Sequence, residues 1–184
     1  MMMPYLTLLG LLPIIGGIVV LVMPARFGKK LGLVFAFATL AAGLVAFFHP
    51  NGSELTEQFE WIAPIGAWYS LGLDGMSKIL VLLTVVLVPI VMLAEWSVDA
   101  PGEEIDGVPA PKRWSGGAFF GHVLLLEGLA LYCFMATDML LFYIFFEATL
   151  IPMYFLIGGW GERNRAGAAL KFLLFNLAGG LVML

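Results

Sequence analysis

Glu147 is the residue of this chain whose type and setting most strongly suggest chemistry. It stands in the segment Phe-Phe-Glu-Ala-Thr-Leu-Ile-Pro, near the middle of a run that is otherwise apolar. An ionised acid at the centre of a membrane costs roughly 2.5–3.5 kcal/mol on insertion scales, so it must pair with another group, contact water or keep its proton. Each of these states suits a site that binds and releases protons. The alternative is a structural acid that ties two helices together.

Three neighbours on the same predicted helix are candidates for a supporting role. Tyr143 precedes Glu147 by one turn and Tyr154 follows it by two, so both hydroxyls would share the face of the carboxylate. Pro152 has no amide hydrogen and leaves the carbonyl of Ala148 without its usual donor, where a water molecule could bind. These residues predict a polar lane along one side of the helix.

Three more polar residues fall inside apolar runs. Glu127 lies in the preceding run, so the two acids are either stations on one proton path or a coupled pair that shares a proton. Lys171 is either a cation on that path or a structural ion-pair partner, and the small residues on its stripe predict that it faces protein. His122 does not share the face of Glu127, which favours a hydrogen-bonded interfacial histidine over a member of the path.

The composition places these residues in a membrane. Hydrophobic residues make up 61% of the 184 residues and charged residues 12%, where soluble domains carry roughly a quarter charged. This balance gives no support to nucleic-acid binding. The single cysteine, Cys133, excludes a disulfide framework and a thiolate metal site, and no glycine-rich dinucleotide motif is present.

Six apolar segments approach the roughly 20 residues that are needed to cross a hydrocarbon core. We therefore predict an all-α integral membrane protein, with residues 1–184 forming a single membrane domain. The first segment lacks a basic region before it, so we interpret it as a retained anchor and not as a signal peptide. The expected transmembrane helices are 4–23, 31–48, 76–96, 116–136, 138–158 and 167–184.

The connections add an orientation and one further element. Polar and aromatic residues alternate in 49–75, which predicts an interfacial hairpin, while 98–115 reads as a solvated loop. Asp74 and Asp138 are placed to cap the helices that follow them. Seven of the nine Lys and Arg residues fall in three connections that share one side of the membrane, so the positive-inside rule puts the N-terminus outside.

Four phrases together resemble a known family. They are Gly-Leu-Asp-Gly-Met-Ser at 72–77, Leu-Leu-Glu-Gly at 125–128, the long run from Thr-Asp-Met-Leu to Tyr-Phe-Leu-Ile-Gly at 137–158, and Ala-Ala-Leu-Lys-Phe at 168–172. The chain resembles the N-terminal part of the antiporter-like membrane subunits of proton-translocating NADH:quinone oxidoreductase (respiratory complex I), and among them subunit M. The similarity runs from end to end in the same order.

The resemblance implies a fold of about fourteen helices built from inverted repeats, of which this chain holds six. It implies that Glu147 is the family's fifth-helix glutamate, whose charge state responds to a lysine in a seventh helix that this chain does not reach. Asn176 and Gly180 differ from the family, where hydroxyl residues are expected.

The implied function is proton translocation through a buried Glu/Lys path, in a subunit of the enzyme that has no redox centre of its own. FMN, Fe–S clusters, NADH and quinone would belong to partner subunits, and neighbouring antiporter-like subunits and lipid would be the direct partners. The implied location is the bacterial inner (plasma) membrane with a periplasmic N-terminus. The alternatives are a cation/proton antiporter subunit without a redox partner and a structural membrane scaffold.

Overall fold

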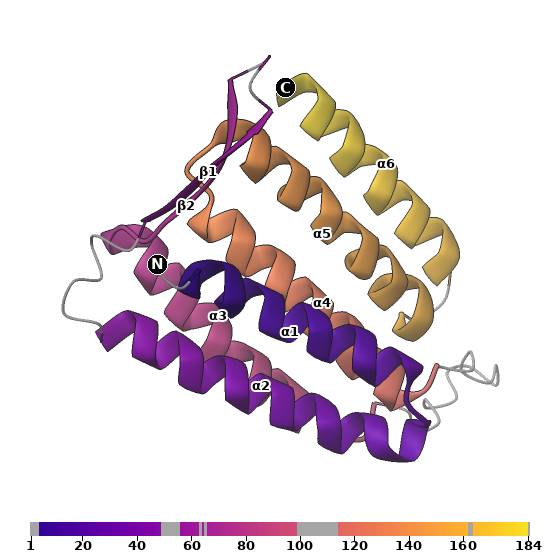
Figure 1. The fold of residues 1–184 in the computed structure, drawn as a ribbon. Helices are drawn as coiled ribbons and strands as arrows, with labels where there is room; N and C mark the ends of the chain where they lie inside the picture. The colour runs from indigo at the N-terminus through magenta and orange to yellow at the C-terminus, as the bar shows by residue number, and fades with distance from the viewer. Residues whose placement is uncertain are drawn as a thin grey trace.

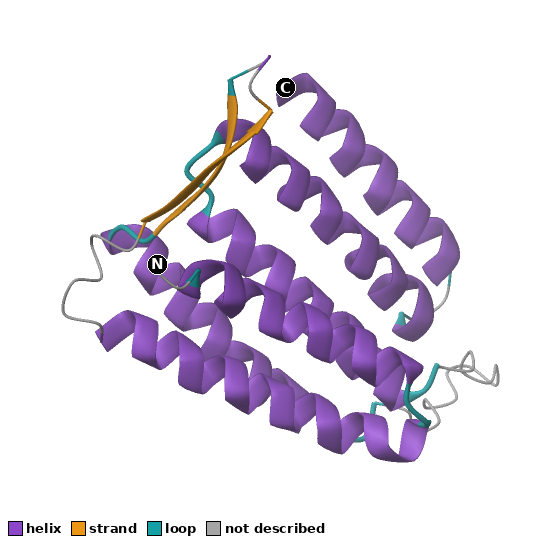
Figure 2. Ribbon diagram, in the orientation of Figure 1, coloured by secondary structure: helices purple, strands orange, loops and turns teal. Residues whose placement is uncertain are grey.

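A computed structural model describes residues 4–48, 56–62, 64, 66–98, 114–161 and 164–183. Within these ranges the chain forms six helices and one β-hairpin (Figures 1 and 2). All six helices are long and apolar enough to cross a membrane by length and composition, which confirms the predicted fold class. The elements are α1 (Tyr5–Val22), α2 (Ala25–Phe48), β1 (Thr56–Ile62), β2 (Ala67–Gly72), α3 (Gly75–Ala94), α4 (Gly116–Met135), α5 (Met139–Trp160) and α6 (Arg165–Met183).

The start of α2 corrects one predicted boundary. The apolar run placed it at residue 31, whereas the helix begins at Ala25, directly after Pro24. Lys29 and Lys30 therefore lie on the first turns of a helix and not in a loop. Hydropathy locates the apolar part of a membrane helix, but the helical backbone continues into the charged flank because lysine is a good helix former. The Nζ of Lys29 donates a hydrogen bond to the carbonyl of Trp96 at 2.8 Å, which links this end of α2 to the end of α3.

Close contact between glycines sets the packing of α1 on α4. A Cβ added at Gly17 would lie 2.7 Å from the carbonyl oxygen of Gly121, and a Cβ added at Gly128 would lie 2.7 Å from that of Gly10. In a membrane the apolar surface of a helix gains little by leaving lipid, so close backbone approach through small residues is a main source of association. Glycine at these four positions lets the two backbones meet.

The remaining helices are arranged around this pair. Helices α2 and α3 pack on each other and on α4, whereas α5 packs on α4 and α6 packs on α5. Figure 1 shows α6 at the edge of the arrangement, beside α5. Two groups of buried apolar side chains fill the space among α1, α2, α3 and α4: one is centred on Leu9, Val85 and Leu131, and the other on Val20, Met92 and Phe120.

The hairpin confirms the predicted element between α2 and α3. Its strands pair antiparallel, with Phe59 opposite Tyr69. Glu57 of β1 reaches the start of α1, where it accepts hydrogen bonds from the amides of Leu6 (2.6 Å) and Thr7 (3.1 Å) and from the Thr7 hydroxyl (2.6 Å). The Tyr132 hydroxyl of α4 donates to the carbonyl of Thr7 at 2.7 Å. The carboxylate of Glu57 thus satisfies donors that the first turn of α1 would otherwise leave unpaired.

The two aspartates cap their helices as predicted. Asp138 accepts hydrogen bonds from the amides of Leu140 (2.9 Å) and Leu141 (3.1 Å) at the start of α5, and from Trp68 of β2 (3.2 Å). These amides, Leu141 first, hold the pKa of Asp138 below its usual value. Asp74 forms a capping box with Ser77, whose hydroxyl and amide lower the pKa of the Asp74 carboxyl. Both helices therefore begin at a fixed negative charge.

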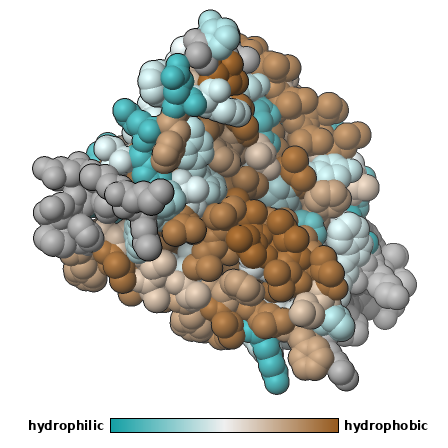
Figure 3. Space-filling model, in the orientation of Figure 1, coloured by the Kyte–Doolittle hydropathy of each residue, from teal (hydrophilic) through white to brown (hydrophobic). Residues whose placement is uncertain are grey.

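The surface separates the helices from the hairpin. In the view of Figure 3 the helical face is mostly apolar, whereas hydrophilic residues gather on the hairpin. Many large apolar side chains are exposed along the helices, among them Ile18 (52%), Phe37 (47%) and Leu83 (58%). Outward apolar faces of this kind are typical of helices that contact lipid.

Candidate functional site

The carboxyl group of Glu147 lies between α5 and α6. Both of its oxygens are shielded from solvent, and among the described residues neither forms a hydrogen bond of regular geometry. On α6 the group meets Gly180, where an added Cβ would overlap Glu147 Oε1 and stand 3.1 Å from Cδ. A carboxyl group that is shielded from solvent inside a membrane bundle is costly to ionise unless other groups stabilise the charge.

Tyr143 lies beside Glu147 as the sequence predicts. It precedes the acid by one turn of α5, and the two side chains interact electrostatically. The edge of its ring (Cε2) would be 3.4 Å from a Cβ at Gly180, so tyrosine and acid face the same point of α6. Tyr143 is therefore a polar neighbour of the Glu147 carboxyl group on α5.

The other predicted neighbours on α5 occupy the turns that follow Glu147. Pro152 is buried within a helix that continues to Trp160, so the proline does not end it. The Thr149 hydroxyl donates to the carbonyl of Phe146 at 2.6 Å. Tyr154 contacts Phe155 edge to face, with 5.5 Å between the ring centroids. The part of the chain that the structure describes gives Tyr154 no contact with Glu147.

Glu127 is the more deeply buried acid and lies in a different place. Only 1% of it is exposed, and neither oxygen has a hydrogen-bond partner among the described residues. On α4 it shares a face with Phe120, Leu124 and Leu131, which pack into the groups of side chains shared with α1, α2 and α3. Glu147 instead points to α6. The geometry therefore disfavours a directly shared proton, because the two acids face different helices.

Lys171 does not face the neighbour that its sequence stripe predicts. The residue is exposed on α6, as are Ala168 and Ala178 of that stripe. Gly180, which meets Glu147, follows Lys171 by nine residues, which is about 180° around an α-helix. The expectation that this lysine faces protein is therefore wrong within the six helices, because buried Ala169 and Gly180 define the inner face of α6. Among the described residues Lys171 is thus on the outer face of α6.

His122 is held in an aromatic setting between α4 and α5. Its Nδ1 is 2.8 Å from the carbonyl oxygen of Ala118, one turn earlier on α4. Its ring centroid is 5.3 Å from that of Phe155 and 6.1 Å from that of Trp160. This is the hydrogen-bonded interfacial histidine that the sequence favours, and the contacts do not connect it to either buried acid.

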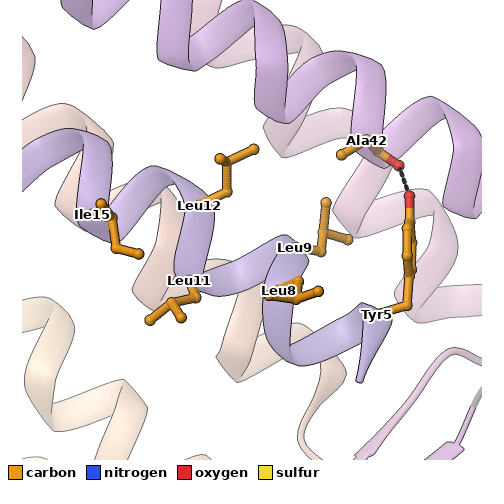
Figure 4. A pocket seen from close by; sticks show the side chains of 7 residues that line it. All are labelled: Tyr5, Leu8, Leu9, Leu11, Leu12, Ile15 and Ala42. Carbon is orange, nitrogen blue, oxygen red and sulfur yellow. Dashed lines mark hydrogen bonds between the residues drawn. The ribbon is translucent and has the colours of Figure 1, made fainter. Parts of the chain in front are cut away.

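A groove on the outside of the bundle carries no chemistry of its own. It lies between α1 and α2, measures about 230 Å³ and is lined by Tyr5 and apolar side chains (Figure 4). Its one drawn polar contact is the hydrogen bond from the Tyr5 hydroxyl to the carbonyl of Ala42, at 2.6 Å. Cys133 is buried and free, and the described residues contain no group of three possible metal ligands. The buried acids thus remain the candidate site.

Two positions that shape the fold and the site were not identified from the sequence. Glu57 appeared only as one polar residue of the hairpin segment, and its contact with α1 joins residues 50 and 51 positions apart. Gly180 was noted only for departing from the family, although it is the residue of α6 that the Glu147 carboxyl group meets. The sequence did offer one signal that could have drawn attention to Gly180: it lies on the same face of the helix as the polar residue Asn176, one turn earlier.

Comparisons with known proteins find a family model and several relatives to which this chain is similar. The family model described as NADH:quinone oxidoreductase/Mrp antiporter, TM matches residues 136–184. NADH-quinone oxidoreductase subunit M of Mycobacterium tuberculosis is 41% identical over 98% of this chain and 37% of the relative. F(420)H(2) dehydrogenase subunit M of Methanosarcina mazei is 34% identical over 100% of this chain and 35% of the relative.

A solved structure agrees with these relatives. A chain of respiratory complex I from Thermus thermophilus with bound NADH superposes with a TM-score of 0.78 and 32% identity, over 96% of this chain and 33% of that chain. The present chain therefore spans about a third of the length of the relatives it matches. Its fold is that of a multi-pass membrane protein.

Proposed function

Because the chain belongs to the family of NADH-quinone oxidoreductase subunit M and its antiporter-like relatives, we propose that the full-length protein translocates protons across the membrane as a subunit without a redox centre. Electron transfer by FMN, Fe–S clusters, NADH and quinone belongs to partner subunits in this proposal. The relatives are about three times longer than this chain, so the six helices form one part of the translocating unit.

The burial of both Glu147 oxygens without a hydrogen bond of regular geometry from the described residues is the observation that carries the proposal. A carboxyl group fixed by several hydrogen bonds keeps one charge state, as at Asp138. Glu147 has no such bonds of regular geometry among the described residues. In this proposal, water and charges that move nearby control whether Glu147 holds its proton. A proton carrier needs this sensitivity, because it must bind a proton in one state and release it in another.

The charge that controls Glu147 would come from beyond this bundle. Lys171 stands on the opposite face of α6 from Gly180, so it is poorly placed to neutralise Glu147 directly. It is well placed to meet helices of the longer protein, where it would act as the cation of a path that continues away from α5. Glu127, buried among the other helices, would be a second station on the route.

The proposed setting is the inner (plasma) membrane of a bacterium, with the N-terminus periplasmic. The ends of α2 and α6 that carry Lys29, Lys30 and Arg165 would then face the cytoplasm, in keeping with the positive-inside rule. The β-hairpin would lie at the periplasmic surface. Neighbouring antiporter-like subunits and lipid would cover the exposed apolar faces of the helices.

Replacement of Glu147 by glutamine tests the proposal. Proton uptake driven by NADH is measured in inverted vesicles that contain the full-length protein, together with NADH oxidation and the amount of assembled complex. We expect pumping and coupled oxidation to be lost while the complex assembles, because glutamine keeps the shape of the side chain and cannot carry a proton.

Glu60→Gln is the matched control, because Glu60 is an exposed glutamate of the hairpin. It should pump normally. Normal pumping by the Glu147→Gln variant would contradict the proposal. Loss of pumping only in proportion to lost assembly would reduce Glu147 to a structural acid and favour the scaffold alternative.

A second candidate is cation/proton antiport without a redox partner, because the matching family model also covers Mrp antiporters. It requires sodium-dependent proton movement in vesicles that receive no NADH. Such movement, abolished by Glu147→Gln, would favour antiport. Its absence alongside NADH-driven pumping would favour the respiratory enzyme.

A further inference from the structure

The space beside Gly180 is occupied by the side chain of Glu147. A Cβ at position 180 would overlap Glu147 Oε1, and it would also lie 3.1 Å from Cδ. Real Cβ atoms do not approach other atoms so closely in packed proteins, so any side chain at this position would force the acid to move. The carboxyl group therefore lies where it does because α6 presents bare backbone at this point.

The adjacent glycine provides an internal comparison. Gly179 is exposed, and no atom of the described residues lies within 4 Å of a Cβ added there. The two glycines are neighbours on one helix, so their effects on the α6 backbone are closely similar. Within the described residues they differ in what they face: Gly179 has no neighbour there, and Gly180 faces Glu147. The requirement for glycine at position 180 is thus one of space and not of helix flexibility.

We infer that Gly180 is a positioning residue for Glu147, which admits the carboxyl group into the interface between α5 and α6 beside the ring of Tyr143. The inference rests on the proposed function of Glu147. It adds that α6, through one missing side chain, selects the position from which that acid exchanges its proton.

Displacement of the carboxyl group has few alternatives. The ring edge of Tyr143 lies 3.4 Å from the Cβ position at residue 180, so the carboxyl group has no room to move toward that ring. A larger residue at position 180 would push Glu147 out of the interface and toward the surface of α5, or would part the two helices. Either result moves the carboxyl oxygens of Glu147 away from Tyr143. A shift of about 1 Å in a reacting group can lower the rate by as much as 10²-fold.

Gly180→Ala and Gly179→Ala form the matched pair of variants in the full-length protein within the assembled complex. The readouts are the ratio of protons pumped to NADH oxidised and the infrared carbonyl band of protonated Glu147, which is assigned by its loss in Glu147→Gln. We expect Gly180→Ala to lower pumping by roughly tenfold or more and to shift the band. Gly179→Ala should change neither.

Shortening the acid should relieve the overlap. Glu147→Asp withdraws the carboxyl group by one methylene. Alone, it should lower pumping below that of the unaltered protein. Combined with Gly180→Ala, it should raise pumping above that of Gly180→Ala alone. If Gly180→Ala fails to assemble, Glu147→Ala added to it should restore assembly, because the overlapping group is then absent. Failure of that restoration would contradict a steric conflict between the two positions.

The outcomes separate the inference from the function on which it rests. Equal pumping and an unchanged band in Gly180→Ala and Gly179→Ala, with Glu147→Gln inactive, would overturn the positioning role and leave the proposed function intact. Normal pumping by Glu147→Gln would overturn both. A shifted band in Gly180→Ala together with restored pumping on addition of Glu147→Asp would establish the role of Gly180.

Discussion

Two glutamates of this chain occupy opposite conditions. Glu57 lies in the hairpin and accepts three hydrogen bonds, two from amides and one from the Thr7 hydroxyl. Glu147 lies between two membrane helices, and no hydrogen bond of regular geometry reaches its oxygens from the described residues. The same side chain is fixed in one place and unfixed in the other.

The contrast distinguishes an acid whose hydrogen bonds stabilise the fold from an acid that is proposed to bind and release a proton. Three donors bind the carboxyl group of Glu57 and hold the hairpin against α1, so loss of this side chain would disturb the structure. No hydrogen bond of regular geometry ties the Glu147 carboxyl group to the other described residues, so little of the fold depends on that group. Glu127 resembles Glu147 in this respect, and Asp74 and Asp138 resemble Glu57.

Removal of Glu57 should have the largest effect on stability. Glu57→Ala leaves the amides of Leu6 and Thr7 and the Thr7 hydroxyl without their acceptor at the first turn of α1. Hydrogen bonds to a charged group contribute about 1.5–3 kcal/mol each when buried, so we expect a loss of about 2–3 kcal/mol in this partly exposed place. Thermal unfolding of the purified complex in detergent measures it.

Glu60→Ala is the control for this prediction. Glu60 lies on the same strand opposite Trp68, and it is exposed. Surface exchanges of this kind usually change stability by less than about 0.5 kcal/mol. Equal stability of the two variants would mean that the contact between hairpin and α1 does not support the fold, and the contrast between the two glutamates would fail.

A variant of Glu127 tests whether both buried acids without a hydrogen bond of regular geometry take part in proton transfer. Glu127→Gln keeps the volume of a side chain that is 1% exposed, so the complex should assemble. If Glu127 is a second station, pumping should fall by roughly tenfold or more, since proton transfer by a positioned group contributes at least that much. The comparison variant is Glu95→Gln, which alters an exposed glutamate at the end of α3. Normal pumping with intact assembly would restrict the path to Glu147.

The helices and caps were predictable because they depend on local signals. Apolar runs of the right length identify membrane helices, and Asp138 and Asp74 precede their helices at positions where a carboxylate can accept from free amides. The start of α2 was placed too late because the apolar run begins only after Lys30, whereas the helical backbone already begins at Ala25.

The faces of the helices were less predictable. Small residues on the stripe of Lys171 suggested a packed face, yet α6 turns Ala169 and Gly180 inward and leaves Lys171 exposed. Small residues permit close packing on any side of a helix, and the partner decides which side is used. The contact of Glu57 with α1 joins distant parts of the chain, and no local pattern encodes it.

Asp138 offers the smallest effect and the most direct test of a fixed charge. The amides of Leu141, Trp68 and Leu140 lower its pKa from 3.8 by stabilising the charged form. A group with a lowered pKa in the folded state contributes stability above its unfolded value and loses that contribution as the pH falls through the folded value. The cap should therefore hold at pH 5 and weaken only below about pH 3.8.

Carbon NMR of the full-length protein with labelled aspartate carboxyls measures this titration, and the signal is assigned by its loss in Asp138→Asn. We expect a midpoint below 3.8 for Asp138. Glu60→Ala, which removes no bond of the cap, should leave the midpoint unchanged. A midpoint at or above the ordinary value would show that the amides do not hold the charge, and Asp138 would then no longer stand with Glu57 as an acid fixed by its donors. Asp138 caps the helix that carries Glu147. A confirmed low midpoint would therefore show, on one helix, that hydrogen-bond donors fix the charge of one acid, while the other acid has no such donors of regular geometry.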